Sequence, residues 1–212
     1  MDRASIKERA RFVVRGYRGP SIGVLVLYFV LIAAVGWITF GLGEIFLIPP
    51  IAIGLTMFYL GVWRAENPPF ETLFAAFRRY TQALVGMLWM YLWTFLWSLL
   101  FLIPGVIKSY AYSMTPYLLA DYPDLDPREA LKVSMAITAG HKMEIFVMQV
   151  SFLGWLILSA FTLNILYFVY VGPYMETAMA GLYESLLADA LDRGVITQDN
   201  LFGWNESRMV DR

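Results

Sequence analysis

Residues 97–144 read WSLLFLIPGVIKSYAYSMTPYLLADYPDLDPREALKVSMAITAGHKME. An apolar run breaks here at Pro104-Gly105, resumes as residues 105–121, and then gives way to a charged segment. As a helix, residues 105–121 would extend about 25 Å, which is at the short end for a hydrocarbon core of about 30 Å. Length alone therefore does not decide whether this segment crosses a membrane.

The distribution of basic residues favours a crossing. If residues 105–121 cross, the chain makes six passes, and fifteen of its sixteen Lys and Arg residues fall on the side of the amino terminus, with Lys108 alone near the other. If they do not cross, the split is nine against seven. Because short cytoplasmic loops carry the Lys/Arg excess, we predict six crossings with both termini in the cytoplasm.

Composition points to the same class of protein. The 212-residue chain is 59% hydrophobic and 17% aromatic, with a mean hydropathy of +0.59, whereas soluble domains are about 45–50% apolar. Its apolar runs approach the length of membrane helices and lack the short alternation of barrel strands. We predict an all-α, polytopic transmembrane helical bundle in three parts: a basic amphipathic helix in 1–20, a six-pass membrane domain in 21–193 and a polar tail in 194–212.

The other five crossings are predicted at 21–40, 45–63, 83–103, 145–165 and 167–191. Two further helices are expected at the cytoplasmic surface. One is an amphipathic piece at 71–80, with Leu73, Phe74 and Phe77 facing inward. The other is a helix at 127–139 beside the amino-terminal helix, which begins with Asp126-Pro127 as cap and first-turn proline and ends at Gly140.

The amino-terminal segment 5–17 is predicted to form a basic amphipathic helix. Ser5 and Glu8 have the spacing of a capping box, and five apolar residues share one face, namely Ile6, Ala10, Val13, Val14 and Tyr17. Two interpretations are open. The helix lies on anionic lipid and fixes the topology, or it is an arm that binds a specific lipid or partner.

Candidate ligand-binding residues come from the fourth and sixth passes. The fourth pass is rich in hydroxyl groups, which need partners within lipid, and Pro116 interrupts its helix. Polar atoms on a broken helix line cavities in transporters, although inert bundles also pack this way. An intramembrane carboxylate is a functional-site hypothesis by default. The candidates are Lys108, Tyr110, Tyr112, Tyr117, Tyr174 and Glu176.

Two more features of these passes have alternative interpretations. Lys108 and Glu176 are predicted to face each other as a polar cluster at the outer end of the bundle; alternatively, Lys108 reaches the interface alone and Glu176 is protonated or hydrated. The third pass carries Trp89, Trp93 and Trp97 on one helix face. This stripe packs against a neighbouring helix or lines a ligand site.

Five polar residues are predicted to lie at the cytoplasmic interface and to contact lipid head groups: Arg64, Arg78, Arg79, His141 and Lys142. His141 is the only histidine and the chain has no cysteine, so we predict no metal site, no cofactor and no catalytic residue. A net charge of −1 gives no indication of nucleic-acid binding.

Several motifs stand out along the chain: Trp97 to Gly105 (WSLLFLIPG), Tyr112 to Pro123 (YSMTPYLLADYP), Glu129-Ala130, Gly140 to Lys142 (GHK), Ser151 to Trp155 (SFLGW) and Pro173-Tyr174. Together they resemble a bacterial integral membrane family of unknown function. The resemblance runs from about Lys7 to Leu187 and is more distant to the membrane domain attached to some glycerophosphodiester phosphodiesterases. It implies a location in the bacterial cytoplasmic membrane. Asn164 and Met143-Glu144 depart from the family pattern, and the family supplies no catalytic residues.

Three functions are compatible with these features. The first is a non-enzymatic protein that binds or moves a lipid or small amphiphile. The second is a structural or regulatory subunit, with a second copy of the chain or another membrane protein as partner. The third is a membrane enzyme acting on lipid head groups, which would need a cluster of acid and base residues that the sequence does not offer.

Overall fold

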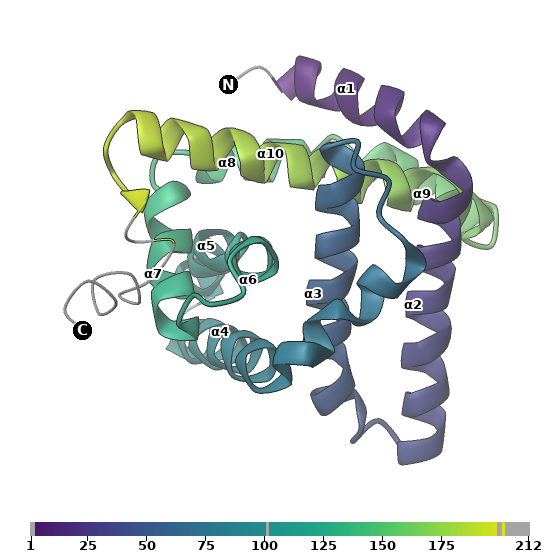
Figure 1. Cartoon of the computed structure of the whole chain (residues 1–212), viewed down its shortest axis with the longest axis horizontal. Coiled ribbons are helices and arrows are strands. Elements are labelled where there is room, and N and C mark those ends of the chain that lie inside the picture. The colour runs from purple at the N-terminus through teal and green to yellow at the C-terminus, as the bar shows by residue number, and fades with distance from the viewer. Residues whose placement is uncertain (1–2, 101, 199–200, 202–212) are drawn as a thin grey trace, which may run out of the picture.

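A computed structural model describes residues 3–100, 102–198 and 201. All regular elements within these residues are helical. In chain order they are α1 (Arg3–Gly16), α2 (Arg18–Thr39), α3 (Glu44–Trp63), η1 (Phe70–Arg79), α4 (Tyr80–Leu100), α5 (Leu102–Tyr112), α6 (Thr115–Asp121), α7 (Pro127–Ile137), α8 (Lys142–Val150), α9 (Leu153–Phe161), η2 (Tyr167–Val171) and α10 (Gly172–Asp192) (Figure 1).

Four stretches within the described residues have the length and composition of membrane spans. They are Arg18–Thr39, Glu44–Trp63, Phe70–Leu99 and Lys142–Phe161. The predicted fourth pass is divided between the short helices α5 and α6, and the sixth between η2 and α10. An all-helical protein with several potential membrane spans is therefore confirmed, whereas the count of six stays a prediction.

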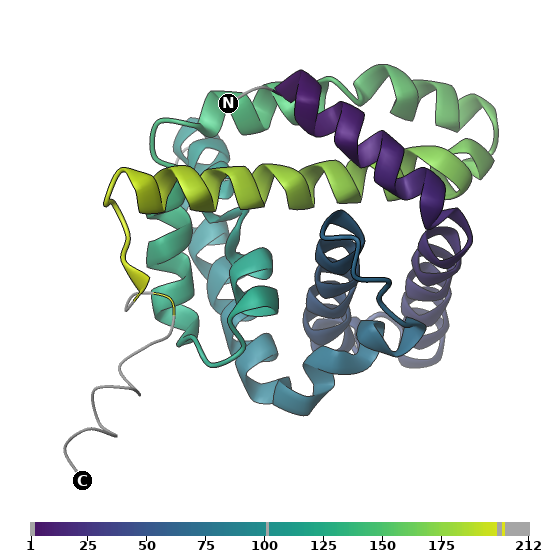
Figure 2. The ribbon, with the colours of Figure 1, turned by 45° about the horizontal axis from the view of Figure 1, so that its top comes forward.

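Helices α3 and α10 form the centre of the molecule. Most of their side chains are buried, and α10 crosses α3 near its carboxyl end, where the indole of Trp63 packs against Gly181. Figures 1 and 2 both show α1 lying along the outer side of α10. Ile6, Ala10 and Val14 of α1 are buried. The apolar face predicted for this helix therefore packs against protein.

Element η1 runs back along α3. A Cβ atom at Gly54 of α3 would overlap the backbone carbonyl of Leu73, so the glycine allows the two backbones to approach. The prediction that Phe74 faces inward is wrong: it is 43% exposed, whereas Leu73 and Ala76 are buried. In a 3₁₀ helix residues i and i+3 share a face, so Leu73 and Ala76 share the buried face.

The stretch 97–144 breaks at more positions than predicted. Helix α5 begins at Leu102, and Pro104 lies in its first turn, where proline lacks no helical hydrogen bond. A break after Tyr112 separates α5 from α6, and Pro116 lies in the first turn of α6 instead of interrupting a longer helix. Gly140, with φ of +86°, follows α7 and turns the chain into α8, as predicted.

The segment 127–139 forms α7 with the predicted start. Asp126 accepts a hydrogen bond from the Arg128 backbone amide at 2.8 Å, and Pro127 is the first helical residue. Its packing partners differ from those expected. Helix α7 lies against α4 and α6, with Ala130, Leu131, Val133, Ser134 and Ile137 buried, whereas α1 packs along α10.

Candidate functional site

The most distinctive cavity is a groove of about 630 Å³ between α4, α5 and α7. We call it the tryptophan groove, because the indoles of Trp89, Trp93 and Trp97 line the part contributed by α4. Its other lining residues are Lys108 and Tyr112 from α5, and Asp126, Arg128, Glu129, Leu131, Lys132 and Met135 from the α7 side.

Local sequence explains how the groove is built. The four-residue spacing of the tryptophans places them along one side of α4, and the Trp89 and Trp93 rings meet edge to face with centroids 5.8 Å apart. Ser134 of α7 holds the helix against α5, because its Oγ donates to the Ala111 carbonyl at 2.8 Å.

A cation lies over an indole at each end of the tryptophan stripe. The Lys108 ammonium is 5.1 Å from the Trp97 ring centre, and the Arg128 guanidinium is 5.3 Å from that of Trp89. Within the described residues, neither has a carboxylate within ion-pair distance. Of the two acids in the groove, Glu129 pairs with Lys132 at 2.6 Å, and Asp126 accepts the capping hydrogen bond of α7.

This arrangement fits a ligand with an anionic group and an apolar body. The two indoles at the ends of the stripe are about 12 Å apart along the helix, from the rise of 1.5 Å per residue. Indole faces supply apolar contact and hold the cations by cation–π attraction, worth about 0.5–2 kcal/mol each. Cations without carboxylate partners can bind phosphate or carboxylate groups by charge-assisted hydrogen bonds.

The predicted ligand residues are only partly brought together. Lys108 and Tyr112 lie in the tryptophan groove, with the Lys108 ammonium 5.8 Å from the Tyr112 ring centre. The other three tyrosines pack against aromatic rings elsewhere: Tyr110 against Phe146, Tyr117 against Tyr183 and Tyr174 against Phe152.

The direct pairing of Lys108 with Glu176 does not form. Among the described residues Lys108 contacts the Met135 sulfur at 3.7 Å and the two aromatic rings of the groove, and it forms no ion pair. Glu176, on α10, is partly buried and also lacks an ion-pair partner within the described chain. Because α7 packs against α5, Lys108 contacts Met135 of α7. The order of the predicted passes along the chain does not indicate this contact.

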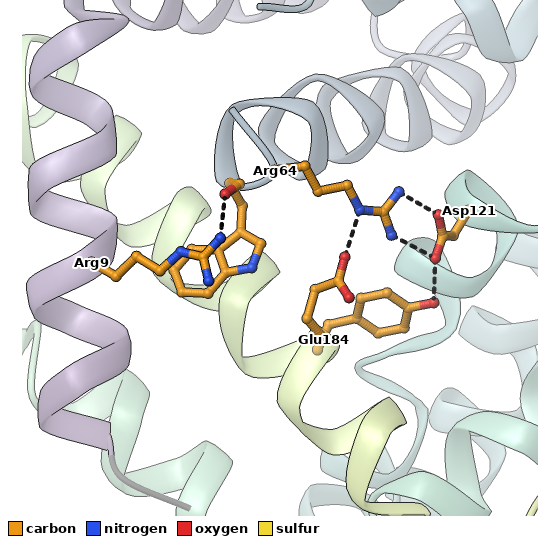
Figure 3. Close-up of polar contacts among 6 residues, drawn as sticks. Arg9, Arg64, Asp121 and Glu184 are labelled. Carbon is orange, nitrogen blue, oxygen red and sulfur yellow. Dashed lines mark hydrogen bonds and ion pairs between the residues drawn. The ribbon is translucent and has the colours of Figure 1, made fainter. Parts of the chain in front are cut away.

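Arg64 occupies a three-helix ion-pair cluster (Figure 3). Its guanidinium donates to both oxygens of Asp121, at 2.7 and 2.9 Å, and its Nε donates to Glu184 at 2.6 Å. Tyr183 OH also donates to Asp121, at 3.2 Å. The hydrogen bonds to Asp121, and less strongly the one to Glu184, raise the pKa of Arg64. Since its partners come from the end of α6 and from within α10, the predicted head-group residue joins the ends of α3 and α6 to α10.

His141 is likewise held within the protein. Its Nδ1 is 3.1 Å from Glu144 and its Nε2 is 3.1 Å from Asp189, which also pairs with Arg193 at 2.6 Å. The neighbouring Lys142 begins α8. No group of three or more metal-ligating side chains suited to a metal ion occurs in the part of the chain that the structure describes.

Arg78 and Arg79 lie side by side at the end of η1 but differ in their contacts. Arg79 donates to the Pro123 carbonyl at 3.0 Å and pairs with Asp124. Arg78 is exposed and, within the described chain, makes no hydrogen bond or ion pair. Both line a second cavity, between α3, η1, α4 and α6.

Sequence reasoning missed Arg128 and the three-helix cluster. The tryptophan spacing was visible, but nothing in the sequence assigned Arg128 to Trp89. Arg128 stands two residues after the Asp126 cap and four before Lys132, and this spacing was the available sign that α7 carries cations on one side.

Residues 99–190 match a protein family described as "Protein of unknown function (DUF975)". The matched part contains Lys108, Arg128, Asp121 and Glu184, whereas the tryptophan stripe and Arg64 precede it. No curated protein matches the chain. No solved structure matches it either. A region of unknown function is therefore confirmed, and the distant similarity to phosphodiesterase membrane domains stays a prediction.

Proposed function

We propose that this protein is a non-enzymatic, multi-pass membrane protein that binds or moves an anionic amphiphile, whose head group is held in the tryptophan groove. The single observation that carries the proposal is the pair of cations, Lys108 and Arg128, lying over indoles without carboxylate partners. A charge held beside apolar aromatic walls matches a molecule that has a charged head and a hydrocarbon body.

We further propose six crossings of a bacterial cytoplasmic membrane with both termini in the cytoplasm. The three-helix cluster supports this topology. Arg64 follows the second predicted pass and Asp121 ends the fourth, and these two side chains are in direct contact, while Arg64 also contacts Glu184 within α10. Helices that cross in alternating directions bring the ends of even-numbered passes to one side.

The loop before the third crossing and the sixth crossing make the greatest demands on this topology. Element η1 runs back along α3, and Tyr80 OH at the start of α4 donates to the Phe46 carbonyl near the start of α3 at 3.3 Å. Helix α10 crosses the end of α3 and lies along α1 in both views (Figures 1 and 2). If α1 is at the inner surface, α10 is strongly inclined to the membrane normal. The proposal therefore depends on the segment 162–166, between α9 and η2, reaching the outer surface.

The binding proposal is tested by lipid titration. Purified protein in nanodiscs of phosphatidylcholine is titrated with phosphatidylglycerol, and bound lipid is counted by native mass spectrometry. We expect the double substitution Lys108→Gln/Arg128→Gln to weaken binding about tenfold, which corresponds to about 1.4 kcal/mol. The exposed Arg15→Gln of α1 is the matched control for lost charge. Equal affinity in all three proteins would contradict the proposal.

A further inference from the structure

The cavity beside Arg78 and Arg79 is separate from the tryptophan groove. It has a volume of about 490 Å³ and lies between α3, η1, α4 and α6. The segment 119–127 separates the two sites by crossing α4 at Gly86, where a Cβ atom would meet Leu119 and Pro127. The Gln82 amide donates to the Leu125 carbonyl at 2.6 Å and fixes this segment. The two sites can therefore be tested independently.

The interior of this cavity is apolar. Ile53 of α3, Ala76 of η1, Ala83 of α4 and Leu119 of α6 are all buried there. The small alanine side chains leave the space that larger residues would fill, and Met57 contributes a flexible, polarizable wall. The volume lies within the range of about 300–1,000 Å³ of small-molecule pockets. An apolar cavity of this kind accepts hydrocarbon.

The polar lining residues differ in whether they are engaged. Arg79 is paired with Asp124 and bonded to the Pro123 carbonyl, and Gln82 is bonded to the Leu125 carbonyl. Arg78 is the lining cation that has no such contact within the described chain. A ligand that fills the cavity with hydrocarbon would place an anionic end group within reach of this guanidinium.

We propose that this cavity binds a single-chain anionic amphiphile, a long-chain carboxylate, with its chain between α3 and α4 and its carboxylate on Arg78. The planar guanidinium binds a carboxylate in two parallel hydrogen bonds, which a neutral alcohol does not accept. The site does not depend on the tryptophan groove, because its lining residues and its cation are different.

The test uses the full chain in phosphatidylcholine nanodiscs with stearate spin-labelled near its methyl end. Electron paramagnetic resonance should show an immobilised component that unlabelled stearate displaces and stearyl alcohol does not. Arg78→Gln should weaken binding about tenfold, and Arg78→Lys should restore part of it. Ala83→Leu, which fills the cavity, should also abolish the component, and circular dichroism confirms that this variant is folded.

Because the tryptophan groove also fits an anionic amphiphile, all stearate measurements are compared in the Lys108→Gln/Arg128→Gln background, in which the component that depends on Arg78 should persist. An immobilised component that persists at wild-type affinity in Arg78→Gln would overturn the proposal. So would displacement by stearyl alcohol as effective as displacement by stearate. Complete loss of the component in the Lys108→Gln/Arg128→Gln background would overturn it as well, because the chain would then occupy the groove.

Discussion

At the scale of single residues, the basic side chains divide into those with carboxylate partners and those without. Arg64 and Arg79 are paired, whereas Lys108, Arg78 and Arg128 face cavities without a carboxylate partner in the described chain. The sequence places most of these charges near a membrane surface by the positive-inside rule. The sequence does not show which basic residues are paired, because the partners of Arg64 and Arg79 lie far from them along the chain.

Arg64→Lys is predicted to destabilise the protein. Lysine keeps the charge but loses the planar fork that bonds Asp121 and Glu184 together. Because Arg64 is about one-third exposed, we expect a loss of about 1–2 kcal/mol, toward the low end for hydrogen bonds to charged groups. Thermal unfolding in detergent measures it. Arg79→Gln removes a more exposed ion pair and should lower the free energy of unfolding by at most about 1 kcal/mol. A loss equal to or larger than that of Arg64→Lys would contradict the stabilising role assigned to Arg64.

Gly54→Ala is predicted to be the more severe of two matched glycine substitutions. Its new methyl group would overlap the Leu73 carbonyl, and relieving such overlap costs about 1–3 kcal/mol. Gly154→Ala, inside α9 with no atom within 4 Å, should instead stabilise its helix by about 0.5–1 kcal/mol. The same unfolding assay measures both. A neutral Gly54→Ala would show that η1 does not approach α3 this closely.

At the scale of elements, helix starts were predictable and helix breaks were not. Asp126-Pro127 and Gly140 act through their immediate neighbours, so the sequence alone places the limits of α7. The break after Tyr112 and the 3₁₀ geometry of η1 depend on packing against other helices. The four-residue spacing of the tryptophans predicts a stripe on one face of α4, but it does not decide between helix packing and a ligand site. That choice depends on the approach of α7 to α4, which is a contact between segments distant in the sequence.

Docking of α1 on α10 is predicted to depend on Ala10, which is fully buried. The chain has no cysteine, so a single introduced cysteine reports accessibility directly. Val14→Cys should resist maleimide in the otherwise unchanged protein and react rapidly in Ala10→Asp, because a buried carboxylate separates the helices. Phe12→Cys, at a position 76% exposed, should react in both. Rapid labelling of Val14→Cys without Ala10→Asp would contradict the packing of α1.

At the scale of the whole molecule, two observations bear on the number of membrane crossings. The distribution of Lys and Arg predicts six crossings, and the ion pair of Arg64 with Asp121 brings the ends of the second and fourth predicted passes together. Length and hydropathy support four spans. The difference arises because the predicted fourth pass is divided between the short helices α5 and α6, and because α10 of the predicted sixth carries Glu176, Glu184 and Asp189.

Cysteines at three exposed positions test this topology in intact cells. A membrane-impermeant maleimide should label Leu42→Cys and Ile165→Cys from outside, because both lie in outer turns if there are six crossings. Asp124→Cys should react only after permeabilisation. Labelling of Ile165→Cys only after permeabilisation would remove the last two crossings, and external labelling of Asp124→Cys would place α6 and α7 outside.

The central claim is that an anionic amphiphile occupies the tryptophan groove, and photocrosslinking tests it most directly. Phosphatidylglycerol carrying a diazirine near its head group is activated in nanodiscs, and the modified residues are mapped by mass spectrometry. The account predicts that label concentrates on 89–97 of α4 and 128–135 of α7 and is lost in Lys108→Gln/Arg128→Gln. Label spread equally over the exposed residues of α2 and α9, and identical with a phosphatidylcholine probe, would contradict it.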